Sequence, residues 1–375
     1  MTRNPLLLLG EQGQSVWLDN LTRVLLRDGT LARLIKEDGL TGVTSNPSIF
    51  KNAMTTGTAY DAPIRELAKG GRDAVAIYEE LAIEDIRGAA DLLRPVYDRT
   101  RGADGFVSLE VSPHLARDTR GTTDDARRLW RRVERPNVLI KIPGTAEGIP
   151  AIEACLAEGI NINITLLFSL AAHRAVIEAW FRALETRQAN KRPIDRVASV
   201  ASFFLSRIDV KLDRELDALI ARGDRADEAR RARGRTAIAN ARLAYQLWKE
   251  MHAGPRWKKL QDAGARFQRP LWASTSTKDP GEPDVKYVEP LIGRHTVNTM
   301  PDETIDAFRD HGRAVADTVE QGLDEARGVM QVLKTLGIDI DRVTGELVVE
   351  GIDKFVKPFD ALMQALEEKR QALTR

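Results

Sequence analysis

The chain has 375 residues, and its 56 lysines and arginines balance 55 aspartates and glutamates, which leaves a formal net charge of +1. This balance argues against a general electrostatic attraction to nucleic acid or to a membrane surface. A single cysteine, Cys155, excludes an intramolecular disulfide. No apolar run approaches the length of a membrane span, and Pro5–Leu9 is too short for the core of a signal peptide. We therefore expect a soluble, cytoplasmic protein that binds neither nucleic acid nor membrane.

Short apolar segments, each typical of a buried strand, alternate along the chain with amphipathic helical patterns. The strand candidates are Val16–Asn20, Gly42–Asn46, Phe106–Val111, Val138–Ile142, Ile160–Phe168, Val197–Phe204, Pro270–Ser276 and Thr296–Met300. The helical patterns between them include Leu21–Glu37, Ile64–Leu93, Thr123–Val133, Ile149–Ala157, Leu170–Leu184 and a long stretch, Ile208–His252, predicted as two helices broken near Gly223. This alternation predicts an α/β fold with parallel pairing, and a single closed (β/α)8 barrel (a TIM barrel) fits both the count and the length. An open doubly wound sheet is the alternative.

Only helical patterns follow Pro301, so we expect extra helices beyond the barrel. In the last pattern, five apolar residues recur at helical spacing, which predicts that one face packs on the barrel. These are Phe355, Phe359, Leu362, Met363 and Leu366. We therefore expect one barrel domain over residues 1–375, with residues 309–375 as a helical extension packed on the barrel.

The candidate strand Val138–Ile142 carries a lysine, Lys141, in the middle of an apolar run. Lysine is almost never fully buried unless something stabilises it. Burial disfavours the charged form of an amine, and a neutral amine is a nucleophile that can attack a carbonyl. A lysine on an edge strand facing water, or one buried in an ion pair, remain alternatives.

Polar residues also fall at the carboxyl-terminal ends of the other candidate strands, where barrel enzymes build their active sites. They include Asp19, Thr44, Asn46, Ser108, Glu110, Asn161, Asn163, Thr165, Ser202, Ser274 and Ser276. A lysine that condenses with a ketone forms an iminium, and the iminium lets an adjacent carbon–carbon bond break without a metal. Two carboxylates and a hydroxyl can move the protons. The five histidines show no ligand spacing, so a metal-dependent aldolase is disfavoured and no metal site is expected.

Several motifs in order resemble those of the transaldolase family. They are Gly42–Phe50 (GVTSNPSIF), Val138–Thr145 (VLIKIPGT), Asn161–Ser169 (NINITLLFS), Ser202–Asp209 (SFFLSRID) and Thr296–Pro301 (TVNTMP). The resemblance runs from about residue 12 to the end of the chain and is closest to the longer subgroup, which has insertions and a helical extension. It implies transfer of a dihydroxyacetone unit from sedoheptulose 7-phosphate or fructose 6-phosphate to glyceraldehyde 3-phosphate or erythrose 4-phosphate. This is a step of the pentose phosphate pathway that needs no cofactor.

The resemblance also assigns roles to residues at matching positions. Lys141 would form the Schiff base, Asp19 would be the acid/base, and Glu110 would work through a water with Thr165. The residues that would hold the phosphorylated sugar are Asn46, Asn163, Ser202, Phe204 and Arg207. Many family members have a second phosphate arginine after strand seven. Here Lys278, with the hydroxyls of Ser274 and Ser276, is the expected substitute.

Two other functions are left open by the residues. The first is a fructose 6-phosphate aldolase, whose relatives carry glutamine and tyrosine where this chain has Glu110 and Phe204. The second is a phosphosugar-binding barrel without activity. Because Lys141 must be neutral when it attacks, we expect no carboxylate in a tight ion pair with it, and Asp19 and Glu110 should stand back across the substrate. For the assembly we expect a monomer or a homodimer.

Overall fold

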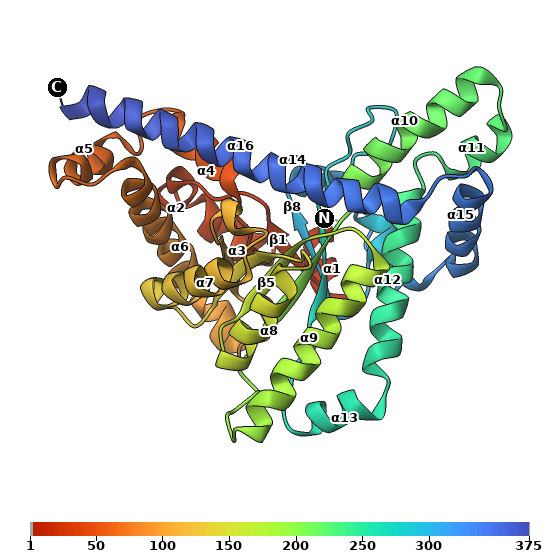
Figure 1. Ribbon diagram of the computed structural model, residues 1–375, viewed down its shortest axis with the longest axis horizontal. Helices are drawn as coiled ribbons and strands as arrows, with labels where there is room; N and C mark the ends of the chain where they lie inside the picture. The colour runs from red at the N-terminus through yellow and green to blue at the C-terminus, as the bar shows by residue number, and fades with distance from the viewer. Residues whose placement is uncertain (1–2, 375) are drawn as a thin grey trace.

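The structure is a computed structural model that describes residues 3–374, and its centre is a closed barrel of eight parallel strands (Figure 1). Each strand pairs with the next, and the last pairs with the first. The strands are β1 (Gln14–Leu18), β2 (Leu40–Val43), β3 (Phe106–Glu110), β4 (Val138–Pro143), β5 (Ile162–Leu167), β6 (Ser199–Phe204), β7 (Arg269–Ala273) and β8 (Thr296–Met300). The predicted (β/α)8 barrel is confirmed, and the pairing of β1 with β8 excludes the open sheet.

Helices surround the barrel and extend beyond it. They are α1 (Pro5–Glu11), α2 (Arg23–Arg27), α3 (Thr30–Glu37), α4 (Pro47–Thr55), α5 (Asp61–Lys69), α6 (Ala74–Arg99), α7 (Thr119–Val133), α8 (Gly148–Glu158), α9 (Leu170–Ala189), α10 (Ser206–Arg222), α11 (Ala226–Ala232), α12 (Thr236–His252), α13 (Pro255–Asp262), α14 (Asp302–His311), α15 (Leu323–Thr335) and α16 (Ile340–Thr374). Three short 3₁₀ turns are η1 (Pro113–Leu115), η2 (Glu289–Leu291) and η3 (Thr318–Glu320). Within the described residues no helix is both long and apolar enough to cross a bilayer.

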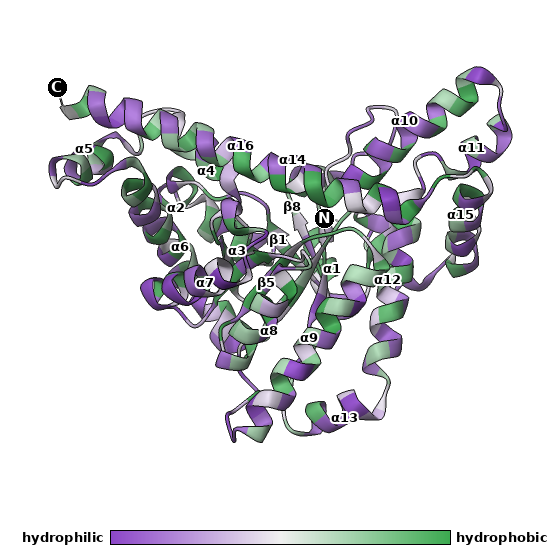
Figure 2. Ribbon diagram, viewed as in Figure 1, coloured by the Kyte–Doolittle hydropathy of each residue, from purple (hydrophilic) through white to green (hydrophobic). Residues whose placement is uncertain are grey.

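The strands are buried on both faces because helices cover the outside and side chains fill the inside. Every residue of β3, β4, β5, β6 and β8 is buried. In Figure 2 the helices around the barrel carry green hydrophobic and purple hydrophilic residues in turn, as amphipathic helices do. Gly42 of β2 lies against the indole of Trp17. A Cβ at this position would lie 2.4 Å from ring atoms, so only glycine fits there.

Three predicted helices are divided in the structure, each at a glycine with a left-handed backbone. Leu21–Glu37 is α2 and α3, separated at Gly29, and Ile64–Leu93 is α5 and α6, separated near Gly71. The long stretch Ile208–His252 contains three helices, because a second break at Gly234 joins the one at Gly223. Positive φ values suit glycine and end a right-handed helix. The break near Gly223 was predicted, whereas helical periodicity across Gly29, Gly71 and Gly234 hid the other three.

The last helix, α16, crosses the molecule above the carboxyl-terminal ends of the strands (Figure 1). It packs against α4, α5 and α6 on one side of the barrel and against α10 on the other, and it touches the end of β5. Its inward side chains include Phe355, Leu362 and Leu366, all buried. This apolar face packs on helices that surround the barrel, and α16 covers the mouth where the strands end. The division into a barrel and an extension over residues 309–375 stays a prediction.

Candidate active site

The register of three neighbouring strands brings the predicted nucleophile beside a carboxylate. Glu110 of β3 pairs with Lys141 of β4, and Lys141 pairs with Asn163 of β5. Lys141 is 5% exposed, and its Nζ donates to the Ser45 carbonyl at 3.1 Å. Its Nζ also lies 3.4 Å from Glu110 Oε2. The expectation that no carboxylate pairs closely with Lys141 is therefore wrong for Glu110, because two buried opposite charges offset each other's loss of hydration.

Burial raises the pKa of the Glu110 carboxyl to about 6, and the positive charges of Lys141 and Arg207 counter part of that rise. Neither oxygen of this carboxylate has a hydrogen-bond partner among the described residues, and the same holds for the buried hydroxyl of Thr165. Buried polar atoms normally have partners. Glu110 Oε1 and the Thr165 hydroxyl are therefore free to hold a hydroxyl group or a water. Glu110 Oε2, 3.4 Å from Lys141 Nζ, makes Glu110 the carboxylate best placed to take a proton from Lys141.

Asp19, just past the end of β1, belongs to a second polar group on the opposite part of the mouth. Its carboxylate accepts a hydrogen bond from the Thr44 hydroxyl at 2.8 Å, and the Thr44 oxygen lies 2.7 Å from the Thr299 hydroxyl. Burial raises the pKa of Asp19, while Lys141 and the Thr44 hydrogen bond oppose that effect. A carboxyl with a raised pKa in a pocket can serve as a general acid or base. The sequence motif Thr296–Pro301 did not single out Thr299, and the structure places the hydroxyl of this residue in the site.

The mouth contains a cavity of about 80 Å³ lined by most of the predicted site residues, including Asp19, Lys141 and Thr165. This volume is below the roughly 300–1,000 Å³ of a typical ligand pocket, so the cavity can enclose only a small molecule or part of a larger one. A separate cavity of about 300 Å³ with mainly apolar walls lies between β3, α4, α6 and α7. Glu110 faces that second cavity, while Asn163 lies beneath the mouth.

Asn163 is fully buried and connects three strands. Its amide nitrogen donates to the Ser108 hydroxyl at 2.9 Å, and its amide oxygen accepts from the Ser202 hydroxyl at 2.7 Å. Ser202 itself lines the mouth cavity. Asn46 also lines it, and its amide oxygen caps α4 by accepting from the Ile49 amide at 3.0 Å. The amide nitrogen of Asn46 is therefore the end suited to a ligand oxygen.

Arg207 stands in the first turn of α10, between two aromatic rings. Its guanidinium carbon lies 4.9 Å from the ring centre of Phe204 and 5.8 Å from that of Phe355. Its Nη1 is buried without a hydrogen-bond partner among the described residues. An arginine beside two rings, with a buried N–H group that has no partner among the described residues, suits a phosphate. Phe355 comes from α16 and lines the mouth cavity. Sequence reasoning placed it on a packing face and missed this position.

The three residues expected to supply a second phosphate contact, Ser274, Ser276 and Lys278, do not all line the mouth cavity. Ser274 lines the mouth cavity, and its hydroxyl lies 2.8 Å from that of Ser206. Lys278 Nζ donates to the Ser276 hydroxyl, but Lys278 lines a different cavity of about 170 Å³ on the outer side of α10. A role for Ser276 and Lys278 in binding stays a prediction.

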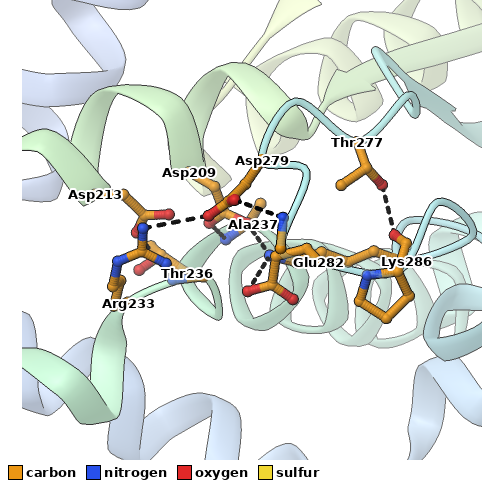
Figure 3. Close-up of polar contacts among 12 residues, drawn as sticks. Asp209, Asp213, Arg233, Thr236, Ala237, Thr277, Asp279, Glu282 and Lys286 are labelled. Atoms are coloured by element: carbon orange, nitrogen blue, oxygen red, sulfur yellow. Dashed lines mark hydrogen bonds and ion pairs between the residues drawn. The ribbon is translucent and has the colours of Figure 1, made fainter.

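An ion-pair network fastens the start of α10 to the chain that follows β7 (Figure 3). Asp209, two residues after Arg207, accepts from the Ala237 amide at 2.8 Å, and the Lys286 ammonium lies 3.5 Å from it. On the outer side, Arg233 donates to Asp279 at 3.2 Å. The network therefore fixes the two segments that carry Arg207 and Ser274.

The comparisons with known proteins agree with this geometry. The family model described as Transaldolase/Fructose-6-phosphate aldolase matches residues 16–366. The chain belongs to this family. It is 48% identical to "Transaldolase 2" of Nostoc sp. strain PCC 7120, over the whole of both chains. It is 48% identical to the "Transaldolase" of Thermobifida fusca over 99% of this chain and all of that one. The "Transaldolase" of Thiobacillus denitrificans is 49% identical over 94% and 96%. The resemblance to the transaldolase family is thus confirmed.

Proposed function

We propose that this protein is a transaldolase, a transferase that moves a dihydroxyacetone unit between phosphorylated sugars in the pentose phosphate pathway. The observation that carries the proposal is the buried Lys141 between Glu110 and Ser45, with Asp19 across the same mouth. The named relatives at 45–49% identity support the same activity. We propose a cytoplasmic location for the enzyme, and a monomeric or homodimeric assembly stays a prediction.

In the proposed reaction, Glu110 takes a proton from the Lys141 ammonium, directly or through a water held with Thr165. The neutral amine adds to the ketone carbon of the donor, and loss of water gives the iminium. Asp19 then removes the proton from the hydroxyl beside the bond that breaks, and the electron pair of that bond moves to the iminium nitrogen. An aldose leaves, and the three-carbon unit stays on Lys141 as an enamine until an acceptor aldehyde arrives.

The phosphate of either sugar would meet Arg207, whose buried Nη1 has no hydrogen-bond partner among residues 3–374 and whose guanidinium lies beside two rings. Asn46 and Ser202 line the same mouth and can hydrogen-bond sugar hydroxyls. Asn163 would act indirectly by fixing the Ser202 hydroxyl.

The test is reductive trapping. Borohydride added with fructose 6-phosphate should leave a covalent adduct that peptide mass mapping places on Lys141. The Lys141→Ala variant should carry no label and show no turnover, whereas the Lys278→Ala variant should still be labelled at Lys141. Label on another residue, or none, would remove the Schiff-base mechanism and favour a binding protein without activity. Dominant release of free dihydroxyacetone by the wild type, with erythrose 4-phosphate present, would favour the aldolase.

A further inference from the structure

Phe355 is the part of α16 that reaches the reacting groups. Its side chain is 4% exposed, and the centre of its ring lies 5.4 Å from Lys141 Nζ and 5.8 Å from the Arg207 guanidinium carbon. The ring thus lies over both Lys141, the proposed nucleophile, and Arg207, which is predicted to bind the phosphate. It is contributed by a helix that lies outside the eight β/α units of the barrel.

Contacts that α16 makes before and after Phe355 fix the position of this ring. Before it, Lys211 of α10 pairs with Glu346 at 2.8 Å and with Glu350 at 2.5 Å. One turn before Phe355, Gly351 lets α16 lie close to the end of β5, since a Cβ there would be 2.8 Å from the Leu166 side chain. After it, Phe359 packs edge-on against Tyr78 with ring centres 5.5 Å apart. The fold therefore holds Phe355 over the mouth.

The fate of the lysine-bound enamine decides whether the enzyme transfers or merely cleaves. In transfer, the enamine carbon attacks the aldehyde of the acceptor. In release, that carbon takes a proton to give the iminium, one water adds to the iminium carbon, and the carbon–nitrogen bond breaks to give free dihydroxyacetone and the lysine amine. Transfer ends with the same hydrolysis, at the iminium of the longer ketose, so each outcome consumes one water. The two outcomes differ in whether a proton and a water reach the three-carbon unit before the acceptor does, and keeping solvent from that unit therefore favours transfer.

We propose that Phe355 determines this partition, by covering the lysine-bound three-carbon unit and keeping solvent away from it. The mouth cavity of about 80 Å³ fits this role, since it encloses only a fragment of this size beneath the ring. The ring face also suits the cationic iminium, which an aromatic face attracts. The inference rests on the proposed function, and it adds a specificity-determining residue from outside the barrel.

The experiment compares Phe355→Ala and Phe355→Leu with the wild type. Each is supplied with fructose 6-phosphate and erythrose 4-phosphate, and free dihydroxyacetone and sedoheptulose 7-phosphate are both measured. We expect Phe355→Ala to raise the ratio of release to transfer about tenfold, and Phe355→Leu, which keeps an apolar cover, to raise it less. With donor alone, the adduct on Lys141 that borohydride can trap should decay faster in Phe355→Ala than in the wild type.

Leu366→Ala is the control, because it truncates a buried apolar side chain further along the same helix that lines neither the mouth cavity nor the cavity that Glu110 faces. Its release-to-transfer ratio should equal that of the wild type. An unchanged ratio in Phe355→Ala, or an equal rise in both alanine variants, would overturn the role of this ring. If the wild type formed no adduct at all, the proposed function itself would fail, which is a distinct result.

Discussion

At the scale of single residues, the contact between Lys141 and Glu110 explains how the mouth can hold a reactive amine without substrate. Each group would be costly to bury alone, and their 3.4 Å approach lets each offset the other's loss of hydration. The pair also stores the proton where the reaction needs it, because proton transfer to Glu110 makes the amine neutral. The carboxylate is thus a proton acceptor as well as a counterion.

This assignment predicts the pH dependence of kcat/KM. The pKa of Glu110 is raised by burial to about 6, so on lowering the pH through 6 the carboxyl gains a proton and can no longer accept one. A sugar phosphate titrates near the same pH. On the acidic side, the plot of log kcat/KM against pH should therefore approach a slope of two for the wild type. In Glu110→Gln this slope should fall from two to one, and kcat at pH 8 should fall about 10²-fold.

Asp213 provides the control for this measurement. Burial raises the pKa of its carboxyl to about 6 as well, but it lines the cavity on the outer side of α10. Asp213→Asn should therefore keep the full acidic limb. A slope of two in the Glu110→Gln enzyme would assign the titration to another group.

At the scale of elements, α10 is the helix whose placement matters most for substrate. Arg207 is in its first turn, and Asp209 in the same turn connects it to α12 and to the segment between β7 and β8 (Figure 3). The hydroxyl of Tyr287 also donates to Asp209 at 2.8 Å. One buried carboxylate thus has three partners on two segments, and its loss leaves each of these donors without that partner.

We expect Asp209→Ala to lower the free energy of unfolding by about 3–5 kcal/mol, the usual effect of removing one member of a buried ion pair. The folded fraction should also show a raised KM for fructose 6-phosphate, because Arg207 loses its support. Asp217→Ala serves as the comparison, since Asp217 is about half exposed where it pairs with Arg233. Its effect should stay below about 1 kcal/mol. Urea unfolding followed by circular dichroism measures both, and equal effects would contradict the buried network.

At the scale of the whole molecule, α16 turns an open barrel mouth into a covered one (Figure 1). Two kinds of contact hold it there: a buried apolar face and ion pairs near its ends, such as Lys369 with Asp61 at 2.5 Å. Exposed and half-exposed ion pairs contribute little to stability, whereas a buried leucine contributes several kcal/mol. The apolar face should therefore dominate.

Leu362→Ala and Lys369→Ala test this order. Leu362 is fully buried, so its truncation should cost about 2–5 kcal/mol in urea unfolding. Lys369→Ala should cost less, about 1–2 kcal/mol, because the side chains of this pair are still 21% and 27% exposed. Hydrogen exchange should show faster amide exchange in residues 340–374 for the leucine variant. A larger loss in the lysine variant would mean that charge holds the helix.

Local pattern in the sequence was enough for the barrel and for most of its mouth. Strand alternation and apolar runs located all eight strands within a few residues, and strand ends marked Asp19, Glu110, Lys141 and Thr165. The alternation of side chains along a strand did not distinguish the role of Asn161 from that of Asn163. They share a face, but Asn161 lies before β5 and its amide nitrogen donates to backbone carbonyls at the other end of the barrel.

The sequence by itself determined which residues form strands, which face each side chain takes and which family the chain resembles, because these follow from local periodicity and motif order. Only the tertiary structure decided that Glu110 approaches Lys141, that Lys278 lines a cavity other than the mouth and that Phe355 covers the mouth. Those distances depend on the register between strands and on where a helix more than 200 residues along the chain from Lys141 comes to pack. Helical spacing in a sequence shows that Phe355 faces inward, but the packing of α16 against α4 and α10 determines what it faces.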